Sequence, residues 1–372
     1  MKGQHIKNTI NIKAVLKGMN SMKVFSHDNS VNHTSNYDHS KLISRHSHLC
    51  FSAEYASVFE KMDTGIPEEF VYTSKNGTVI HTFIKRQLPY EVEGKEYFDI
   101  TTPYGFGGPL VIHTTDVEKL LKEYFDAFHH YCIENNIVSE FVRFHIFDNA
   151  VVCKYYSGET FEINSVIYKD LDKNISKEME PRILKDVKKA EHAKISVEFD
   201  YVGDTQTDFL SLYTETMDRH HAVRYYYIDH SFLNNLRDRL KGQYVFANAR
   251  LSGKIISTRL VLFDRSYGYY FLGGNDANYY DLKSGTYLDY MLLNELKGKG
   301  VAKYIFGGGH NGNDGLYKYK KKFSMNGEIP FFVGNTVHIK DVYDELIQIR
   351  MSKGPFDSGS SFFPKYRSPE AR

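Results

Sequence analysis

The sequence predicts an α/β (α+β) protein with two similarly folded units in tandem, each a mixed β-sheet flanked by helices. The first reason is length, because 372 residues correspond to about two domains of the usual size. The second is composition, since 41% of the residues are apolar and can build a sizeable core. The third is order: the same succession of strands, a turn and a helix occurs in each half of the chain.

The first half begins after a polar, weakly periodic stretch, residues 1–48, which we expect to be a flexible leader. Two strands then flank a turn at Asn76-Gly77, and a third strand, KEYFDI, leads into the glycine-rich TTPYGFGGP. An apolar stripe predicts a helix in TDVEKLLKEYFDAFHHYCIENN, and a strand follows in IVSEFVRFHIF. These elements define the first unit as residues 49–180.

The second half repeats this order at low sequence identity. Two strands flank Ser252-Gly253, and a third, SYGYYFLGG, ends in a turn at Gly273-Gly274. A helix begins near Ser284, and the strand AKYIFGGG follows it. We therefore place the second unit in residues 181–352, with a basic connecting helix at its start and a C-terminal tail in residues 353–372.

The connecting helix is predicted in EPRILKDVKKAEHAKISVEF, where Pro181 suits the first helical position. Its basic residues fall mostly on one side of the helix and are Arg182, Lys185, Lys188 and Lys189. Two interpretations stay open: this side is solvated, or it contacts an anionic substrate or RNA phosphate.

Overall charge and cysteine content limit the classes of function. The 47 lysines and arginines balance 46 aspartates and glutamates, so nothing global indicates nucleic-acid binding, and no DNA partner is expected. Cys50, Cys132 and Cys153 show no CxxC or Cys/His spacing, which predicts no metal site and a reducing compartment. No apolar run approaches the ~20 residues of a membrane span, and the N-terminal region is too polar for a signal peptide. We therefore expect a cytoplasmic protein.

The stretch FGGGHNGNDGLYKYKKKFS, residues 306–324, combines a glycine-rich turn with a run of lysines. Its spacing matches neither a P-loop nor GxGxxG, but the backbone N–H groups of such a turn can bind an anion or stabilise an oxyanion. On a helical wheel, Lys320 lies beside the apolar stripe of Leu316, Tyr319 and Phe323. A lysine directed inward needs an anionic partner, a polar cleft or a lowered pKa, whereas a lysine that reaches solvent needs none of these.

The tyrosines of SYGYYFLGG are a second candidate for chemistry. Strand alternation places Tyr267, Tyr269 and Phe271 on one face and Tyr270 and Leu272 on the other. By default, a tyrosine in such a strand packs in the hydrophobic core and has no role in chemistry. A tyrosine at the cleft-facing end, such as Tyr270, can instead take a proton from an attacking amine, directly or through a water molecule.

Several motifs together resemble one family. They are YFDITTPYGFGGP in the first half, PRILKDVKKAEHAKISVEF at the connection, and YYFLGGNDANYYDLKSGTYLDYMLLNELKGKGVAKYIFGGGHNGNDGLYKYKKKFS in the second half, with FFPKYR at residues 362–367. The combination resembles the Fem-type transferases and their relatives in the GNAT acetyltransferase superfamily, over roughly residues 50–367. The resemblance implies two tandem GNAT-like domains and transfer of an acyl or aminoacyl group to a primary amine.

The resemblance also assigns roles to residues. Lys320 matches the family lysine that stabilises developing charge, and Tyr270 is the catalytic residue expected beside it. The donor is expected at Gly273, Gly274, Ser284 and Gly285. The acceptor is expected at Arg219, which by similarity holds a phosphate, and at Tyr104, Gly105 and Asn313.

The donor stays open between two co-substrates, acyl-CoA and aminoacyl-tRNA, and no tightly bound cofactor is expected. The coenzyme A motif [RQ]xxGx[GA] is not legible before the helix at Ser284. The long helical-hairpin arm of some tRNA-using members is also absent, because the sequence in residues 210–245 is too short and irregular for it.

Three functions therefore remain at the level of sequence. The first is acyl or aminoacyl transfer to an anionic, nucleotide- or lipid-linked precursor of the bacterial cell envelope or of peptidoglycan, with tRNA and peripheral membrane contact as further partners. The second is acetyl-CoA-dependent N-acetylation of an amino sugar in surface polysaccharide synthesis. The third is a non-catalytic RNA-binding module, in which the lysines and tyrosines of residues 317–322 mix charge with stacking rings.

Overall fold

The computed structural model describes residues 22–26, 48–309, 312, 314–354 and 362–369. The expected leader, residues 1–48, therefore lies outside the described residues except for one strand and His48. Asn313 also lies outside them.

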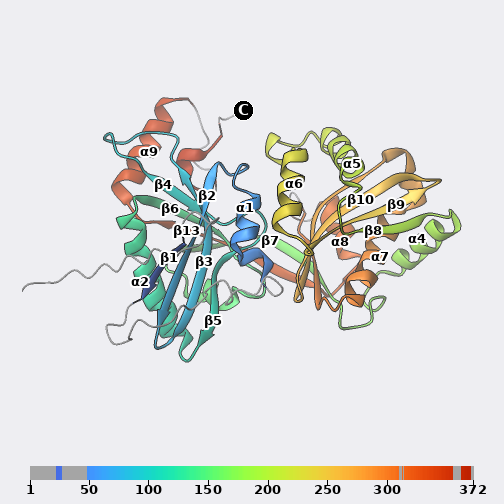
Figure 1. Cartoon of the computed structure of the whole chain (residues 1–372), viewed down its shortest axis with the longest axis horizontal. Helices are drawn as coiled ribbons and strands as arrows, with labels where there is room; N and C mark the ends of the chain where they lie inside the picture. Colours follow the sequence, from blue (N-terminus) through green and yellow to red (C-terminus); the bar gives the residue numbers. More distant parts are fainter. Residues whose placement is uncertain (1–21, 27–47, 310–311, 313, 355–361, 370–372) are drawn as a thin grey trace, which may run out of the picture.

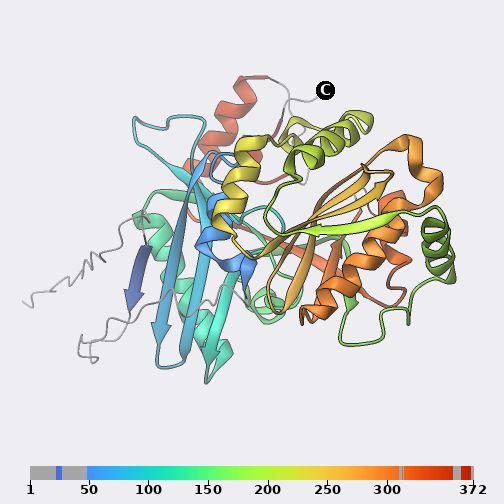
Figure 2. The same cartoon turned by 45° about the vertical axis from the view of Figure 1, so that its right-hand side comes forward.

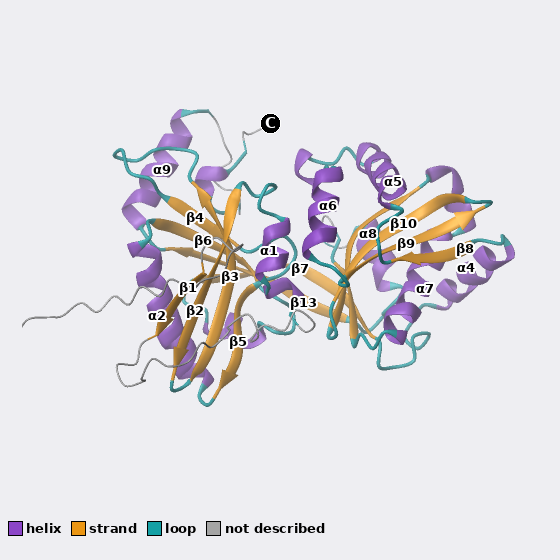
Figure 3. Cartoon of the chain, in the orientation of Figure 1, coloured by secondary structure: helices purple, strands orange, loops and turns teal. Residues whose placement is uncertain are grey.

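The described residues form a 13-stranded mixed sheet that runs through both halves of the molecule (Figure 1; Figure 3). Its order is β1-β2-β3-β4-β6-β13-β7-β12-β11-β10-β9-β8, and β5 pairs with β3. The strands are β1 (Met22–Ser26), β2 (Gly65–Ser74), β3 (Gly77–Gln87), β4 (Phe98–Thr101), β5 (Gly108–Thr114), β6 (Ile137–Arg143), β7 (Glu159–Asp170), β8 (Ser196–Asp200), β9 (Tyr244–Leu251), β10 (Lys254–Phe263), β11 (Tyr267–Asn275), β12 (Lys303–Gly307) and β13 (Glu328–Val337).

Helices cover this sheet in each half. The α-helices are α1 (Ala53–Val58), α2 (Val117–Glu134), α3 (Ala150–Tyr155), α4 (Pro181–His192), α5 (Gln206–Arg219), α6 (His230–Arg239), α7 (Ser284–Gly298), α8 (Gly315–Lys321) and α9 (Lys340–Ser352). The 3-10 helices are η2 (Leu49–Phe51), η3 (Arg224–Tyr226), η4 (Ala277–Leu282) and η5 (Lys365–Arg367). Among the residues that the structure describes, none of the helices has both the length and the apolar character needed to cross a membrane.

The predicted duplication of order is confirmed. In the first half, the β2–β3 hairpin is followed by β4, α2 and β6, and in the second half the β9–β10 hairpin is followed by β11, α7 and β12. The second hairpin turns at Ser252-Gly253 as expected. The first turns one residue earlier than expected, at Lys75-Asn76, because Gly77 already pairs with Ser74.

The two halves exchange their last strands. β7 follows the first half in the chain, yet it pairs with β12 of the second half. β13 follows the second half, yet it pairs with β6 of the first half. β7 and β13 also pair with each other, at the centre of the molecule in Figure 1. Each half therefore completes its part of the sheet with a strand that follows the other half in the chain.

Side-chain contacts join the halves as well. One core cluster contains Phe59 and Ile80 from the first half and Phe232 and Phe246 from the second. The Asn235 side-chain amide donates a hydrogen bond of 3.1 Å to the carbonyl of Ser57, which links α6 to α1.

The basic connecting helix is α4, and Pro181 is its first residue as predicted. Its apolar residues Ile183, Val187 and Ala190 are buried, and α4 lies beside α7 on the outside of the second half (green and orange in Figure 2). The basic side chains of Arg182, Lys185, Lys188 and Lys189 are exposed.

Residues near the C-terminus are anchored on the first half by a buried carboxylate. Asp99 on β4 is fully buried and forms ion pairs with Arg86 and Arg367. Tyr366, also fully buried, donates a hydrogen bond of 3.1 Å to Asp99 Oδ2, and its hydroxyl lies 2.8 Å from Ser139 Oγ.

We expect Tyr366→Phe to lower the free energy of unfolding by about 1.5 kcal/mol, because it removes a hydrogen bond to a buried charged group. Urea unfolding measures the change. The control is Tyr227→Phe, since the Tyr227 hydroxyl bonds Asp218 at the surface and should contribute less than about 0.5 kcal/mol. Equal losses in the two variants would contradict a special role for the buried bond.

Candidate active site

The candidate site lies where β11 and β12 diverge. The two strands pair in parallel only from Tyr267 to Tyr269, opposite Lys303 to Ile305. Beyond that point β11 continues along β10, while β12 continues along β7. Among the described residues, no strand therefore pairs with the backbone of β11 beyond Tyr269 on the β12 side.

A β-bulge marks the same point. Leu260 of β10 pairs with Leu272, but its neighbour Val261 pairs with Tyr270, so Phe271 is an extra residue in β11. Strand alternation predicts that Tyr270 and Leu272 lie on the same face of β11. Because of the bulge, Leu272 instead packs in the same cluster as Phe271, and Tyr270 packs in another. This second cluster contains Leu288 and Leu292 of α7.

Lys320 reaches the point of divergence from α8. Its side chain is only 6% exposed, so the inward direction, one of the two that the sequence left open, is the one that the structure has. Lys320 Nζ donates a hydrogen bond of 2.7 Å to the carbonyl of Gly308, just after β12, and lies 5.3 Å from the centre of the Tyr270 ring on β11. Its neighbour Lys318 on α8 is exposed.

The environment of Lys320 lowers its pKa to about 8. Burial is the largest cause, because it disfavours the charged form. The carboxylates of Asp289 and Asp314 oppose this effect, and the charge of Arg259 adds to it. At neutral pH Lys320 is thus a cation that is poorly solvated, next to Tyr270.

A buried ion pair supports this arrangement. Arg259 on β10 and Asp289 on α7 form a two-pronged pair with distances of 2.8 and 3.2 Å, and both side chains are almost fully buried. The Tyr319 hydroxyl donates a hydrogen bond of 2.6 Å to Asp289 Oδ2, which ties α8 to α7. The Arg259 guanidinium lies 5.6 Å from the Tyr270 ring centre, so two cations, Arg259 and Lys320, lie close to this ring.

The Tyr270 hydroxyl is held in its neutral form. Burial raises its pKa, and the charge of Arg259 opposes this effect. A neutral phenol with a raised pKa is a better proton donor to a developing anion than a proton acceptor from an amine.

The predicted turn at Gly273-Gly274 is wrong, because both glycines lie within β11 and pair with Arg259 and Thr258 of β10. Close approach explains why they are glycines. A Cβ on Gly273 would lie 2.4 Å from the Tyr270 hydroxyl, and one on Gly274 would lie 2.5 Å from the carbonyl oxygen of Leu212 on α5. The first glycine leaves room for the Tyr270 side chain, and the second allows α5 to lie against the strand.

Ser284 and Gly285 form the start of α7, close to the end of β11. The Ser284 hydroxyl lies 2.7 Å from Ser257 Oγ, in the interior. A Cβ on Gly285 would lie 2.9 Å from Arg259 Nη2 and 2.8 Å from Asn275 Oδ1. The donor-binding role expected for both residues stays a prediction.

Arg219 reaches the same end of β11 from α5. Its Nη2 donates hydrogen bonds of 3.1 Å to Thr216 Oγ1 and to the carbonyl of Asn275, while its buried Nε has no partner among the described residues. Asn275 Oδ1 also accepts a hydrogen bond from Arg259 Nη1 at 3.2 Å. The structure therefore brings Arg219 close to the predicted donor residues.

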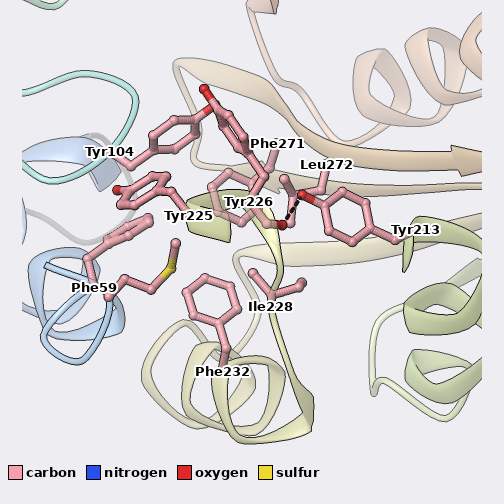
Figure 4. Close-up of a pocket in the computed structure, with 10 residues that line it drawn as sticks. Phe59, Tyr104, Tyr213, Tyr225, Tyr226, Ile228, Phe232, Phe271 and Leu272 are labelled. Atoms are coloured by element: carbon pink, nitrogen blue, oxygen red, sulfur yellow. Dashed lines mark hydrogen bonds between the residues drawn. The ribbon is translucent and has the colours of Figure 1, made fainter. Parts of the chain in front are cut away.

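Tyr104 packs against Phe271, whereas Lys320 lies against Tyr270, and Gly105 directly follows Tyr104 in the chain. Tyr104 belongs to a pocket whose walls are aromatic or aliphatic side chains from both halves (Figure 4). The pocket is lined by Phe59, Met62, Tyr104, Tyr213, Tyr225, Tyr226, Ile228, Phe232, Phe271 and Leu272. It borders the bulge through Phe271, whose ring centre is 6.1 Å from that of Tyr104. Most of these residues were not among the sequence candidates, although the run Tyr225-Tyr226-Tyr227 was a visible signal.

An RNA-binding surface over residues 317–322 does not fit this geometry. The side chains of Tyr317 and Lys320 are buried, and the Tyr319 hydroxyl is bonded to Asp289 in the interior. No mixed row of exposed rings and charges exists in the described part of this segment. Among the described residues, no group of three or more histidine, cysteine, aspartate or glutamate side chains could hold a metal ion.

Comparisons with known proteins give a family match for much of the second half and a similar fold for most of the chain. Residues 180–321 match the family model described as an acetyltransferase (GNAT) domain. The structure resembles the crystal structure of FemX with a TM-score of 0.64 and 14% identity, over 84% of this chain and 98% of FemX. It also resembles the C-terminal domain of a protein named as a lysylphosphatidylglycerol synthetase of Agrobacterium fabrum, with a TM-score of 0.51 and 12% identity, over 84% of this chain and 97% of that one. A search of curated protein sequences found no match.

These similarities agree with the duplicated order of elements, and the residues that match the family model include Lys320 and Tyr270. Residues 180–321 therefore match an acetyltransferase (GNAT) domain, and the chain as a whole shares its fold of two similarly ordered units with FemX.

Proposed function

We propose that the protein transfers an acyl or aminoacyl group from a thioester or ester donor to a primary amine of a bacterial cell-envelope or peptidoglycan-type precursor. The observation that carries this proposal is the buried Lys320, held between Tyr270 and the end of β12. A buried cation at a strand divergence suits a reaction in which negative charge develops on a carbonyl oxygen.

In the proposed reaction, the neutral amine attacks the donor carbonyl and forms the C–N bond. The ammonium of Lys320 and the backbone N–H groups of β11 at the bulge stabilise the oxyanion. When the intermediate collapses, the C–S or C–O bond of the donor breaks. Tyr270 gives its proton to the leaving sulfur or oxygen and regains one from the amine, directly or through water.

Two partners follow from this scheme. Because GNAT domains use acyl-CoA as a co-substrate, acyl-CoA is the first donor to test, and aminoacyl-tRNA is the second. The exposed basic side chains of α4 offer a positive face to the phosphates of a tRNA or of an anionic acceptor. Binding through these side chains should weaken as the salt concentration rises.

Calorimetric titration of the purified protein tests the proposal with four ligands: acetyl-CoA, CoA, charged tRNA and uncharged tRNA. Whichever donor binds is then mixed with a nucleotide-linked peptidoglycan precursor, and mass spectrometry detects the acylated amine. Transfer that is lost in Lys320→Ala supports the proposal. Transfer that Lys320→Ala retains at full rate, or no transfer from any donor, would refute it.

The pH dependence of the rate should report the charge on Lys320. Since its pKa is about 8, Lys320 is charged below that pH and neutral above it, so kcat/KM should fall as the pH rises through 8. In Lys320→Arg the charge persists, because the pKa of arginine exceeds 12, and this fall should disappear. Steady-state rates from pH 6 to 10 would check it, and an unchanged profile in the arginine variant would contradict the assignment.

A further inference from the structure

The buried ammonium of Lys320 uses only part of its hydrogen-bonding capacity. A lysine ammonium carries three N–H donors. Among the described residues, Lys320 Nζ forms a single hydrogen bond, to the carbonyl of Gly308, and no carboxylate forms an ion pair with it. Buried donors normally have partners, so the remaining N–H groups of Lys320 are available to a bound substrate.

A buried carboxylate lies close enough to compete for these donors. Asp289 on α7 is bonded by Tyr319, which is the neighbour of Lys320 in the chain. The ring of Tyr270 lies 5.3 Å from Lys320 Nζ and 5.6 Å from the Arg259 guanidinium, and that guanidinium pairs with the carboxylate. Burial lowers the pKa of Lys320, and the charge of Asp289 is the strongest influence that opposes this effect.

Other groups already occupy both oxygens of Asp289. Its Oδ1 accepts a hydrogen bond of 2.8 Å from Arg259 Nε. Its Oδ2 accepts one of 3.2 Å from Arg259 Nη2 and one of 2.6 Å from the Tyr319 hydroxyl, which is the shortest of the three. Hydrogen bonds and a paired cation reduce the field of a carboxylate, so Asp289 attracts Lys320 less strongly than an unbonded carboxylate would.

We propose that Tyr319 is a positioning residue of the acyl-transfer site: together with Arg259 it occupies the carboxylate of Asp289, so that the charge of Lys320 remains available to the substrate. An ion pair between Lys320 and Asp289 would neutralise the charge that the oxyanion needs. This inference rests on the proposed acyl transfer and states what keeps its charged group ready for reaction.

Only a few titratable groups face Lys320, and they come from the elements packed around it. They are Arg259 of β10, Tyr270 of β11, Asp289 of α7, Asp314 at the start of α8 and Tyr319 of α8. Tyr319→Phe removes a hydroxyl that bonds the carboxylate and changes none of the charges in this group.

Tyr319→Phe therefore tests the role, because phenylalanine keeps the ring and its contacts. NMR of the full-length protein with isotope-labelled lysine follows the titration of Lys320, and the signal that is absent from Lys320→Met identifies it. In Tyr319→Phe, the carboxylate attracts the ammonium more strongly, so Lys320 should lose its proton at a higher pH than in the wild type. The fall of kcat/KM with pH should move in the same direction, and kcat should drop by about tenfold.

The matched control is Tyr317→Phe, which removes a hydroxyl from the same helix and leaves the bonds of Asp289 unchanged. It should titrate like the wild type and keep kcat within about twofold. Thermal unfolding of both variants shows whether either substitution disturbs the fold.

A loosened α8 would also raise the pKa of Lys320, because water would then reach its ammonium. The variant Arg259→Met/Asp289→Leu separates the two causes, since it contains no carboxylate on which Tyr319 could act. Adding Tyr319→Phe to this variant should leave the titration of Lys320 unchanged. Asp289→Asn provides a second background without the charge if the double variant does not fold.

The inference is wrong if Lys320 titrates in Tyr319→Phe as it does in the wild type, or if the shift persists in the background without the carboxylate. Because NMR titration needs neither donor nor acceptor, its result is independent of transfer. The expected titrations without transfer from any donor would support the role of Tyr319 in holding the charges and remove the proposed function. Transfer that depends on Lys320, with a titration unaffected by Tyr319→Phe, would leave the proposed function and remove the inference.

Discussion

Lys320→Met is expected to lower kcat/KM for acyl transfer by about 100- to 1,000-fold, which is the usual effect of removing one preorganised group that stabilises an oxyanion. The loss should appear mainly in kcat, because the charge is needed most when the carbonyl oxygen becomes negative. Methionine keeps the length and apolar stem of lysine, so the contacts around α8 are preserved. Steady-state kinetics on the donor identified by titration would measure the effect.

The matched control is Lys318→Met on the same helix, because Lys318 is exposed. This variant should keep the wild-type rate within about twofold. If the two methionine variants lost activity equally, a general change in the charge of α8 would explain the result, and the role assigned to Lys320 would be wrong.

Stability should change in the opposite direction to activity. Burial disfavours the charged form of Lys320, whose pKa is about 8 in the fold and about 10.4 in an unfolded chain. The unfolded state thus binds more protons between these two values, and the wild type gains stability as the pH rises through that window. Lys320→Met carries no such cost, so we expect its free energy of unfolding at pH 7 to equal or exceed that of the wild type. This advantage should shrink between pH 8 and 10.4.

Asp289→Ala is expected to destabilise the protein by about 3–5 kcal/mol, because it leaves the guanidinium of Arg259 buried without its carboxylate. The variant also removes the hydrogen bond from Tyr319, which ties α8 to α7. Lys320 should then be held less firmly, so residual activity should fall as well. Denaturant unfolding and the rate of transfer would be measured on the same preparations.

Two further variants distinguish a lost charge pair from a lost side chain. The double variant Arg259→Met/Asp289→Leu removes both charges and should recover a large part of the lost stability. Asp186→Ala breaks the exposed pair of Arg182 and Asp186 on α4 and should cost less than about 1 kcal/mol. A double variant as unstable as Asp289→Ala would show that the contacts of the side chains, rather than the charges, dominate.

The sequence was sufficient for the order of elements and for the choice of Lys320 as the lysine of α8 to examine. Hydrophobic periodicity is a local property, so it identified the repeated hairpins and helices and placed Lys320 beside the apolar stripe of α8. The local sequence pattern could not identify the residues around Lys320, because Tyr270, Gly308 and Asp289 come from three separate segments of the chain.

The failures have a common physical cause, which is contact between elements distant in the chain. A glycine pair after a strand is typical of a turn, yet Gly273 and Gly274 extend β11 because Tyr270 and α5 need the space that a side chain would occupy. The bulge at Phe271 likewise depends on the register with β10, which sequence alternation alone does not contain.

The exchange of β7 and β13 has a consequence for synthesis of the chain on the ribosome. The first half cannot pair β6 with β13 until Val337 has left the exit tunnel, although β6 itself ends at Arg143. During this interval the edge of β6 that will pair with β13 remains unpaired. Unpaired strand edges are prone to form hydrogen bonds with other chains. The protein therefore assembles correctly only if the free edge of β6 avoids pairing with other chains until β13 has been synthesised.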